Sequence, residues 1–92
     1  MSFYSGIRQE HWLRDKRDGG AIVVLEDESL WEIDPSDRTK TARWLRISTV
    51  TVERTQKERY SYVLMNTMEN ETVRATYRGQ VAHEISSQLG AA

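Results

Sequence analysis

The sequence lacks cysteine, any long apolar run and any strong excess of charge of one sign. Without cysteine there is no disulfide, no thiolate nucleophile and no zinc site built on cysteine ligands. The longest apolar run, Ala21 to Leu25, is too short for a membrane helix, and the first residues show no signal peptide. We therefore expect no membrane association and a cytoplasmic location, or export if the chain is a processed form. The formal net charge of −1 gives the whole molecule no general attraction to nucleic acid.

Catalytic motifs are also missing. The chain has no G-x-S-x-G, P-loop or dinucleotide fingerprint. His11 and His83 are far apart, and His83-Glu84 lacks the second histidine of a zinc-protease motif, so each histidine is expected to be structural or exposed. The acids at 26–28 are typical of a solvated turn rather than of an acid/base pair. We therefore expect a protein that is not an enzyme and has no metal or cofactor site.

The composition is that of one folded domain. Of the 92 residues, 38% are hydrophobic and 29% charged, and three Trp with four Tyr supply large core side chains. A chain of this length can build one hydrophobic core. We therefore expect a single domain over residues 1–92.

Short β-branched and aromatic segments separated by turn residues predict the architecture. Asp18-Gly19-Gly20 is suited to a tight hairpin turn, and Pro35 ends a strand because it has no N–H to donate. The series indicates a mainly β fold, a small antiparallel meander or SH3-like barrel of five to six strands. The expected strands span residues 11–16, 21–25, 30–34, 44–54, 60–68 and 72–78.

Two other segments are expected to differ from strands. Residues 35–43 form a polar connection, with one helical turn near Thr41. Gly79 is expected to end the last strand. After it, apolar residues at helical spacing predict a short amphipathic α-helix over 80–89 that caps the sheet; they are Val81, Ala82, Ile85 and Leu89.

Charge is distributed in two adjacent blocks. Residues 26–37 contain six acids and no base, whereas 38–46 contain four bases and no acid. The two blocks can neutralise each other, or the basic one can form a docking surface, and the sequence leaves both open. Trp44 in that block is either a core residue or a platform on which a base of single-stranded nucleic acid stacks. Trp31 is expected to be buried, and Trp12 partly exposed.

These patterns lead to two functional hypotheses. The first is a non-catalytic binding or assembly module whose partner is another protein. The alternative is an RNA- or DNA-binding barrel that uses the basic segment 38–46. In either case the candidate contact residues are Arg38, Lys40, Arg43, Arg46, Trp44 and Trp12.

One stretch also resembles a known group of proteins. Residues 25–35, LEDESLWEIDP, followed by Asp37 and Trp44, are similar to a motif of small uncharacterised bacterial β-barrel-like proteins: L-E-D-G-S-x-W-E-V, then x-P-x-D, then a second Trp. Residues 62–67 look like the group's Y-x-L-I-N-T strand. In this chain Glu28 replaces the turn glycine, and no export signal is seen although many members are exported. The resemblance implies a compact barrel and implies no activity. The shared pattern also has a structural interpretation, in which Trp31 and Trp44, on either side of the proline-bearing loop, pack against each other.

Overall fold

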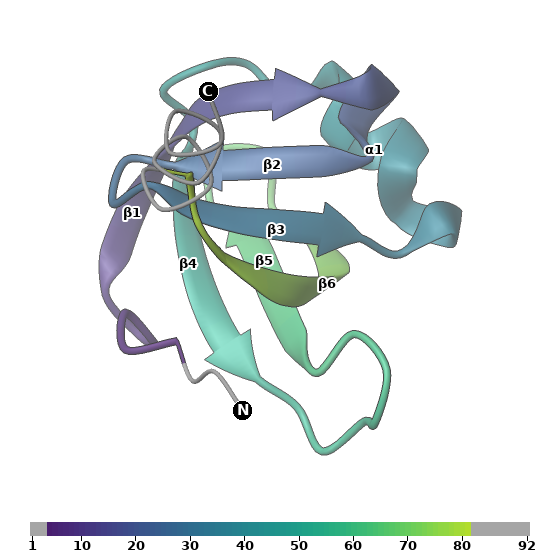
Figure 1. Ribbon diagram of the computed structural model, residues 1–92. Coiled ribbons are helices and arrows are strands. Elements are labelled where there is room, and N and C mark those ends of the chain that lie inside the picture. The colour runs from purple at the N-terminus through teal and green to yellow at the C-terminus, as the bar shows by residue number, and fades with distance from the viewer. Residues whose placement is uncertain (1–3, 82–92) are drawn as a thin grey trace, which may run out of the picture.

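Six antiparallel strands close into a barrel with one short α-helix at its end (Figure 1). The computed structural model describes residues 4–81. The order around the barrel is β1-β2-β3-β6-β5-β4, and pairing of β1 with β4 closes it. The expected mainly β barrel is confirmed. The strands are β1 (Glu10–Arg17), β2 (Ile22–Leu25), β3 (Ser29–Ile33), β4 (Thr49–Arg54), β5 (Tyr62–Asn66) and β6 (Glu71–Gln80).

Trp31 lies at the centre of the core, as the sequence predicts. It is fully buried, and its ring contacts the rings of Tyr4, Tyr62 and Tyr77 at centroid distances of 4.8, 5.2 and 5.2 Å. Its indole Nε1–H donates to the Ser29 hydroxyl at 2.8 Å, which satisfies the one polar atom of the side chain. Tyr4, from the segment before β1, is 4% exposed and joins this cluster.

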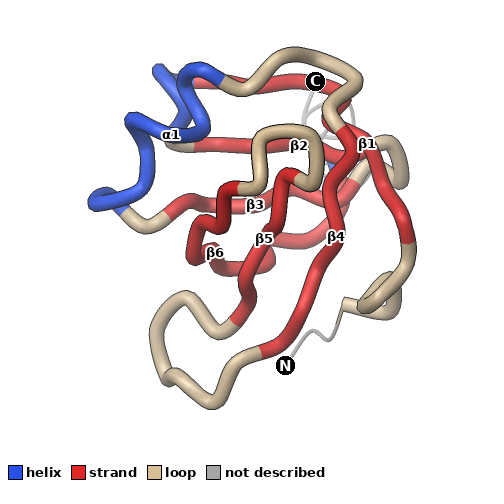
Figure 2. Tube along the Cα trace, turned by 180° about the vertical axis from the view of Figure 1, so that it is seen from behind, coloured by secondary structure: helices blue, strands red, loops and turns tan. Residues whose placement is uncertain are grey.

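The connection between β3 and β4 folds against the end of the β1–β2 hairpin (Figure 2). It contains a 3₁₀ turn, η2 (Pro35–Asp37), and the helix α1 (Arg38–Arg43), which packs on η1 (Asp18–Gly20). The buried Thr41 hydroxyl donates to the Gly20 carbonyl at 2.6 Å. The expected helical turn near Thr41 is therefore confirmed, and it fastens the connection to the barrel.

Three expected strands differ from the observed ones by two residues or more at an end. The strand expected over 60–68 spans only Tyr62–Asn66, because Tyr60 has a φ of 54° and residues 67–70 form a turn. The strand expected over 44–54 begins only at Thr49, because Ile47 has a φ of 66° and the Ser48 hydroxyl closes a turn on the Leu45 carbonyl at 2.5 Å. Gly79 does not end the last strand. With a φ of 95° it carries β6 through an irregularity in register to Gln80.

Two further expectations differ from the structure. The helix expected over 80–89 cannot begin at Gln80, which is a strand residue, and the rest of that range lies outside the described residues. Within residues 4–81, the ring contacts of Trp31 are with tyrosines, so the expected packing of Trp31 on Trp44 is not observed. None of the helices in this part of the chain has the length and hydropathy to cross a membrane.

Candidate functional site

The first half of the predicted basic surface pairs with the acidic block that precedes it. Arg38 donates through Nε to the Ile33 carbonyl at 2.9 Å and lies 3.9 Å from a Glu32 oxygen. Lys40 Nζ lies 3.4 Å from Asp37 Oδ1, one helical turn away. These contacts favour the interpretation in which the two blocks neutralise each other at this end of the barrel.

The second half of the basic surface is more open. Arg43 and Arg46 pair with Glu71 and Asp15 at 3.4 and 3.3 Å, but their side chains remain 72% and 71% exposed. Ion pairs this exposed contribute little stability and exchange readily for contacts with a partner. Of the four predicted cations, these two are therefore the better placed for binding.

Trp44 is a core residue and cannot serve as the stacking platform that the nucleic-acid hypothesis required. It is 1% exposed, and its Nε1–H donates to Glu71 Oε1 at 2.9 Å. A shallow hollow lies over it, lined by Arg43, Trp44, Glu69 and Glu71.

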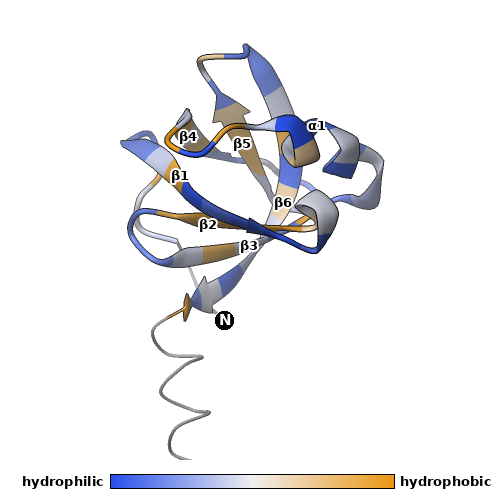
Figure 3. Cartoon of the chain, turned by 90° about the horizontal axis from the view of Figure 1, so that it is seen from above, coloured by the Kyte–Doolittle hydropathy of each residue, from blue (hydrophilic) through white to orange (hydrophobic). Residues whose placement is uncertain are grey.

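Apolar side chains reach solvent beside β1, and of these only the partial exposure of Trp12 was predicted. Trp12, Leu45 and Ile47 are 51%, 67% and 75% exposed. The Ile47 N–H donates to the Leu13 carbonyl at 2.8 Å, and the Leu13 N–H to the Ser48 carbonyl at 2.9 Å, so the 44–48 loop lies along β1. In Figure 3 this loop, between α1 and β4, carries hydrophobic colour on the outside of the barrel. We call Trp12, Leu45 and Ile47 the apolar surface.

The backbone at Ile47 is unusual for its residue type. A φ of 66° is left-handed, and a β-branched side chain there costs about 1–2 kcal/mol. Burial does not offset this cost, because the side chain points into solvent. The backbone bond of Ile47 to Leu13 fastens the loop whatever the side chain, so the choice of a strained, exposed isoleucine points to a functional role.

Charged side chains of both signs surround the apolar surface, because Glu10 also faces outward beside Trp12 and Arg14 pairs with Glu28 at 3.4 Å. Arg14 alternates with Trp12 on the outer face of β1, and Arg46 lies between the two loop aliphatics. Asp15 is bridged by both Arg17, at 3.5 Å, and Arg46, so its charge is already compensated. Arg14 and Arg46 are paired in the same way, but their side chains are 53% and 71% exposed, so both can exchange these pairs for the carboxylates of a partner.

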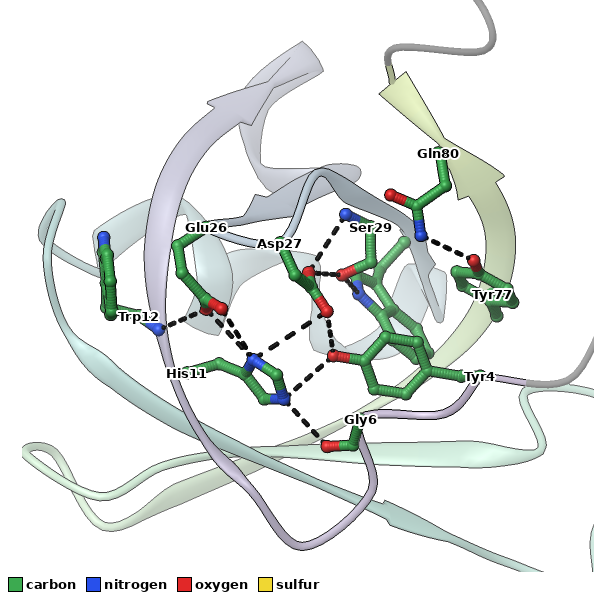
Figure 4. A network of polar contacts seen from close by, with 10 residues as sticks. Tyr4, Gly6, His11, Trp12, Glu26, Asp27, Ser29, Tyr77 and Gln80 are labelled. Carbon is green, nitrogen blue, oxygen red and sulfur yellow. Dashed lines mark hydrogen bonds and ion pairs between the residues drawn. The ribbon is translucent and has the colours of Figure 1, made fainter.

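A second cluster, buried and polar, lies where β1 begins and β2 turns into β3 (Figure 4). His11 is 3% exposed; its Nδ1 lies 3.0 Å from both carboxylate oxygens of Glu26, and its Nε2 lies 2.8 Å from the Gly6 carbonyl. A carboxylate faces Nδ1, and the Gly6 carbonyl and the Tyr4 hydroxyl, at 2.8 and 2.9 Å, face Nε2, so the surroundings favour the protonated ring. Burial lowers the pKa of His11, but the bonds to Glu26 and Gly6 and the charges of Glu26 and Asp27 outweigh it and raise the pKa.

Asp27 connects this histidine to the core. Its Oδ2 accepts from the Tyr4 hydroxyl and its Oδ1 from the Ser29 hydroxyl, both at 2.5 Å, and Ser29 accepts from Trp31. Burial raises the pKa of Asp27, but these donors hold it below its usual value. Burial and the neighbouring Asp27 charge raise the pKa of the Tyr4 phenol. Tyr4 is therefore neutral, Asp27 ionised, and the N-terminal segment is fastened to the barrel.

Sequence reasoning missed this cluster. It read 26–28 as a solvated turn and His11 as an unremarkable residue, because neither shows ligand spacing. One signal was available: Trp12 and Arg14 face outward in β1, so strand alternation places His11 inside with Leu13, where a polar ring needs partners. Among residues 4–81, one group of side chains has the composition of a metal site: His11, Glu26 and Asp27. Each offers one nitrogen or oxygen atom, and these three atoms lie within 4.8 Å of one another.

No family model, curated protein or solved structure matches this chain. The apolar surface and the His11 cluster are therefore the candidate functional sites. The resemblance to the bacterial β-barrel group remains a prediction from the sequence.

Proposed function

We propose that this barrel is a non-catalytic protein-interaction module that docks through the apolar surface. The observation that carries the proposal is Ile47, a β-branched residue held in a left-handed conformation with 75% of its surface exposed. Trp12 and Leu45 extend the apolar area, and the outer face of β1 supplies a rigid support for the loop. We also propose that the barrel is of the SH3-like type and that the chain belongs to the bacterial group that its sequence resembles.

The partner we propose is a protein segment with apolar side chains flanked by carboxylates. Burial of an exposed aliphatic side chain contributes about 1.5–3 kcal/mol, so the apolar surface supplies the affinity. Arg14 and Arg46 beside it would orient the partner's carboxylates. Trp and Arg are the residue types that most often dominate the energy of such interfaces.

RNA or DNA binding is the second candidate. With Trp44 buried, the observation that favours it is Trp12, half-exposed and near Arg14 and Arg46, which together offer a stacking face with cations beside it. It requires an affinity that falls steeply as salt rises, because phosphate contacts release counterions. An apolar protein interface depends on salt much less.

The test begins with a photo-crosslinking residue placed at Ile47 or, as matched control, at Met68, an apolar residue 64% exposed in the turn between β5 and β6. We expect one protein to crosslink in the native host at position 47 and not at 68. Titration of that purified protein should then show that Ile47→Asp weakens binding about 30-fold or more, whereas Met68→Asp leaves it unchanged.

A mixed oligonucleotide pool, titrated in parallel at low and physiological salt, separates the two candidates. Salt-sensitive binding to the pool, lost in Trp12→Ala, would replace the protein-docking proposal by the nucleic-acid one. Equal crosslinking at both positions, or a partner indifferent to Ile47→Asp, would contradict the proposed surface.

A further inference from the structure

The buried polar cluster has the arrangement of a metal site. His11 Nδ1 lies 3.0 Å from Glu26 Oε2 and 3.9 Å from Asp27 Oδ2, and one atom from each side chain lies within 4.8 Å of the others. Ligand atoms about 2.0–2.2 Å from a common tetrahedral ion are about 3.3–3.6 Å apart, between the 3.0 and 3.9 Å observed from His11 Nδ1. Small rotations of the carboxylates suffice to bring the three atoms around one centre.

Each of the three side chains is also held by a partner on its far side. His11 Nε2–H donates to the Gly6 carbonyl at 2.8 Å, which leaves Nδ1 as the nitrogen that faces the carboxylates. Glu26 Oε1 accepts the Trp12 N–H at 3.0 Å, and Asp27 Oδ1 accepts the Ser29 hydroxyl. Metal-binding histidines and carboxylates are commonly oriented by such outer contacts.

Burial fits a site that is sheltered but can be reached. The His11 side chain is 4% exposed, whereas those of Glu26 and Asp27 are 19% and 29% exposed. An ion can therefore enter past the carboxylates, and water can complete its coordination. One imidazole nitrogen with two carboxylates suits Zn²⁺, Co²⁺ or Mn²⁺ better than Ca²⁺ or Mg²⁺, which take oxygen ligands.

We propose that His11, Glu26 and Asp27 bind one divalent transition-metal ion through His11 Nδ1 and one oxygen of each carboxylate. On binding, the Nδ1 proton is released to solvent and the nitrogen lone pair goes to the metal, while both carboxylates stay ionised. The inference does not depend on the docking function, and its test does not involve the partner.

The experiment titrates the full chain, without an affinity tag, with Zn²⁺ and with Co²⁺, followed by calorimetry, thermal unfolding and, for Co²⁺, visible absorption. We expect one ion per chain, a higher melting temperature, and an affinity that increases from about pH 6 to about pH 8 because the proton competes with the metal. His11→Gln should lower the affinity at least about 100-fold. The matched controls His83→Gln and Glu28→Gln should bind as the parent does.

A failure of His11→Gln to fold, judged by tryptophan fluorescence, does not end the test. Tyr4→Phe removes the hydroxyl that bonds Asp27 Oδ2 and lies 2.9 Å from His11 Nε2, so it loosens both side chains and should weaken binding about 10–100-fold. The proposal is overturned if millimolar metal has no effect on the parent, if Tyr4→Phe and Glu26→Gln both bind like the parent, or if His83→Gln abolishes binding.

Discussion

His11 and Trp12 are consecutive residues of β1 that face opposite sides of the barrel wall and bond to the same carboxylate. His11 Nδ1 and the Trp12 backbone N–H both lie 3.0 Å from Glu26 Oε1. The inner polar cluster and the outer apolar surface therefore share one side chain. A substitution of Glu26 is expected to affect both sites. Substitutions of His11 test the polar cluster alone, and substitutions of Ile47 test the apolar surface alone.

Removal of the central tryptophan should nearly unfold the domain. Trp31→Ala empties a fully buried site in contact with three tyrosine rings, and we expect a loss of about 3–5 kcal/mol in the free energy of unfolding. Urea unfolding followed by circular dichroism measures it. The half-exposed Trp12→Ala should cost less than about 1 kcal/mol; equal losses would show that Trp31 is not the centre of the core.

Stability should fall as the pH rises above neutrality. Because the folded-state pKa of His11 is raised above the unfolded value of about 6.5, its contribution is complete below that pH and is lost as the pH passes through the folded pKa. The groups that face the ring stay in one state over this range, Asp27 ionised and Tyr4 neutral. The free energy of unfolding, measured with EDTA present from about pH 6 to about pH 9, should decrease.

His11→Gln is the control for this pH dependence. It keeps hydrogen-bonding capacity but cannot titrate, so the difference in stability between parent and variant should shrink as the pH rises. A difference that is constant with pH would mean that the imidazolium gives no stability. His83→Gln should leave the parent's slope unchanged.

Relief of backbone strain at Ile47 should stabilise the fold. Asparagine tolerates the left-handed conformation, so we expect Ile47→Asn to raise the free energy of unfolding by about 1 kcal/mol, since little buried surface is lost. Thermal and urea unfolding give the change. Ile22→Asn, in β2, should destabilise instead. If Ile47→Asn is also destabilising, Ile47 serves the fold and not a partner.

Two adjacent glycines should respond very differently to alanine. A Cβ at Gly20 would lie 2.6 Å from both the Ala42 nitrogen and the Arg38 oxygen, in a residue with a φ of 94°. Clash and backbone strain together should cost about 2–5 kcal/mol and loosen α1 from η1. Gly19→Ala meets open space and should cost about 1–2 kcal/mol, for its φ alone. Equal losses would show that α1 does not depend on this contact.

The barrel could be predicted from the sequence because its strands carry local signals. Alternation in Leu30–Asp34 and in Val73–Tyr77, and the turn residues between strands, identified all six strands. The errors fall where tertiary contacts override local pattern. The 44–48 loop has strand-like residues but takes a turn held by Ser48, and Gly79 continues a strand because its neighbour β3 accommodates the irregular register.

The candidate sites were harder to predict because they bring distant segments together. Arg38 and Lys40 could be expected to meet the preceding acids, but the bonds of Trp44 and Arg43 to Glu71 join residues far apart in the chain. The His11 cluster joins the N-terminal segment, β1 and the β2–β3 turn. The spacing of these residues along the sequence does not predict such long-range contacts.

The position of β6 determines when the chain can fold during its synthesis. Among residues 4–81 it is the last strand made, yet it lies between β3 and β5, so both keep unpaired edges until residues 71–80 have left the ribosome. The β1–β2–β3 meander can form early from neighbouring segments, whereas the other half must wait. Nascent chains that stop before β6 should therefore present open strand edges to chaperones or to one another, and the final closure, made of distant pairings, should set the folding rate.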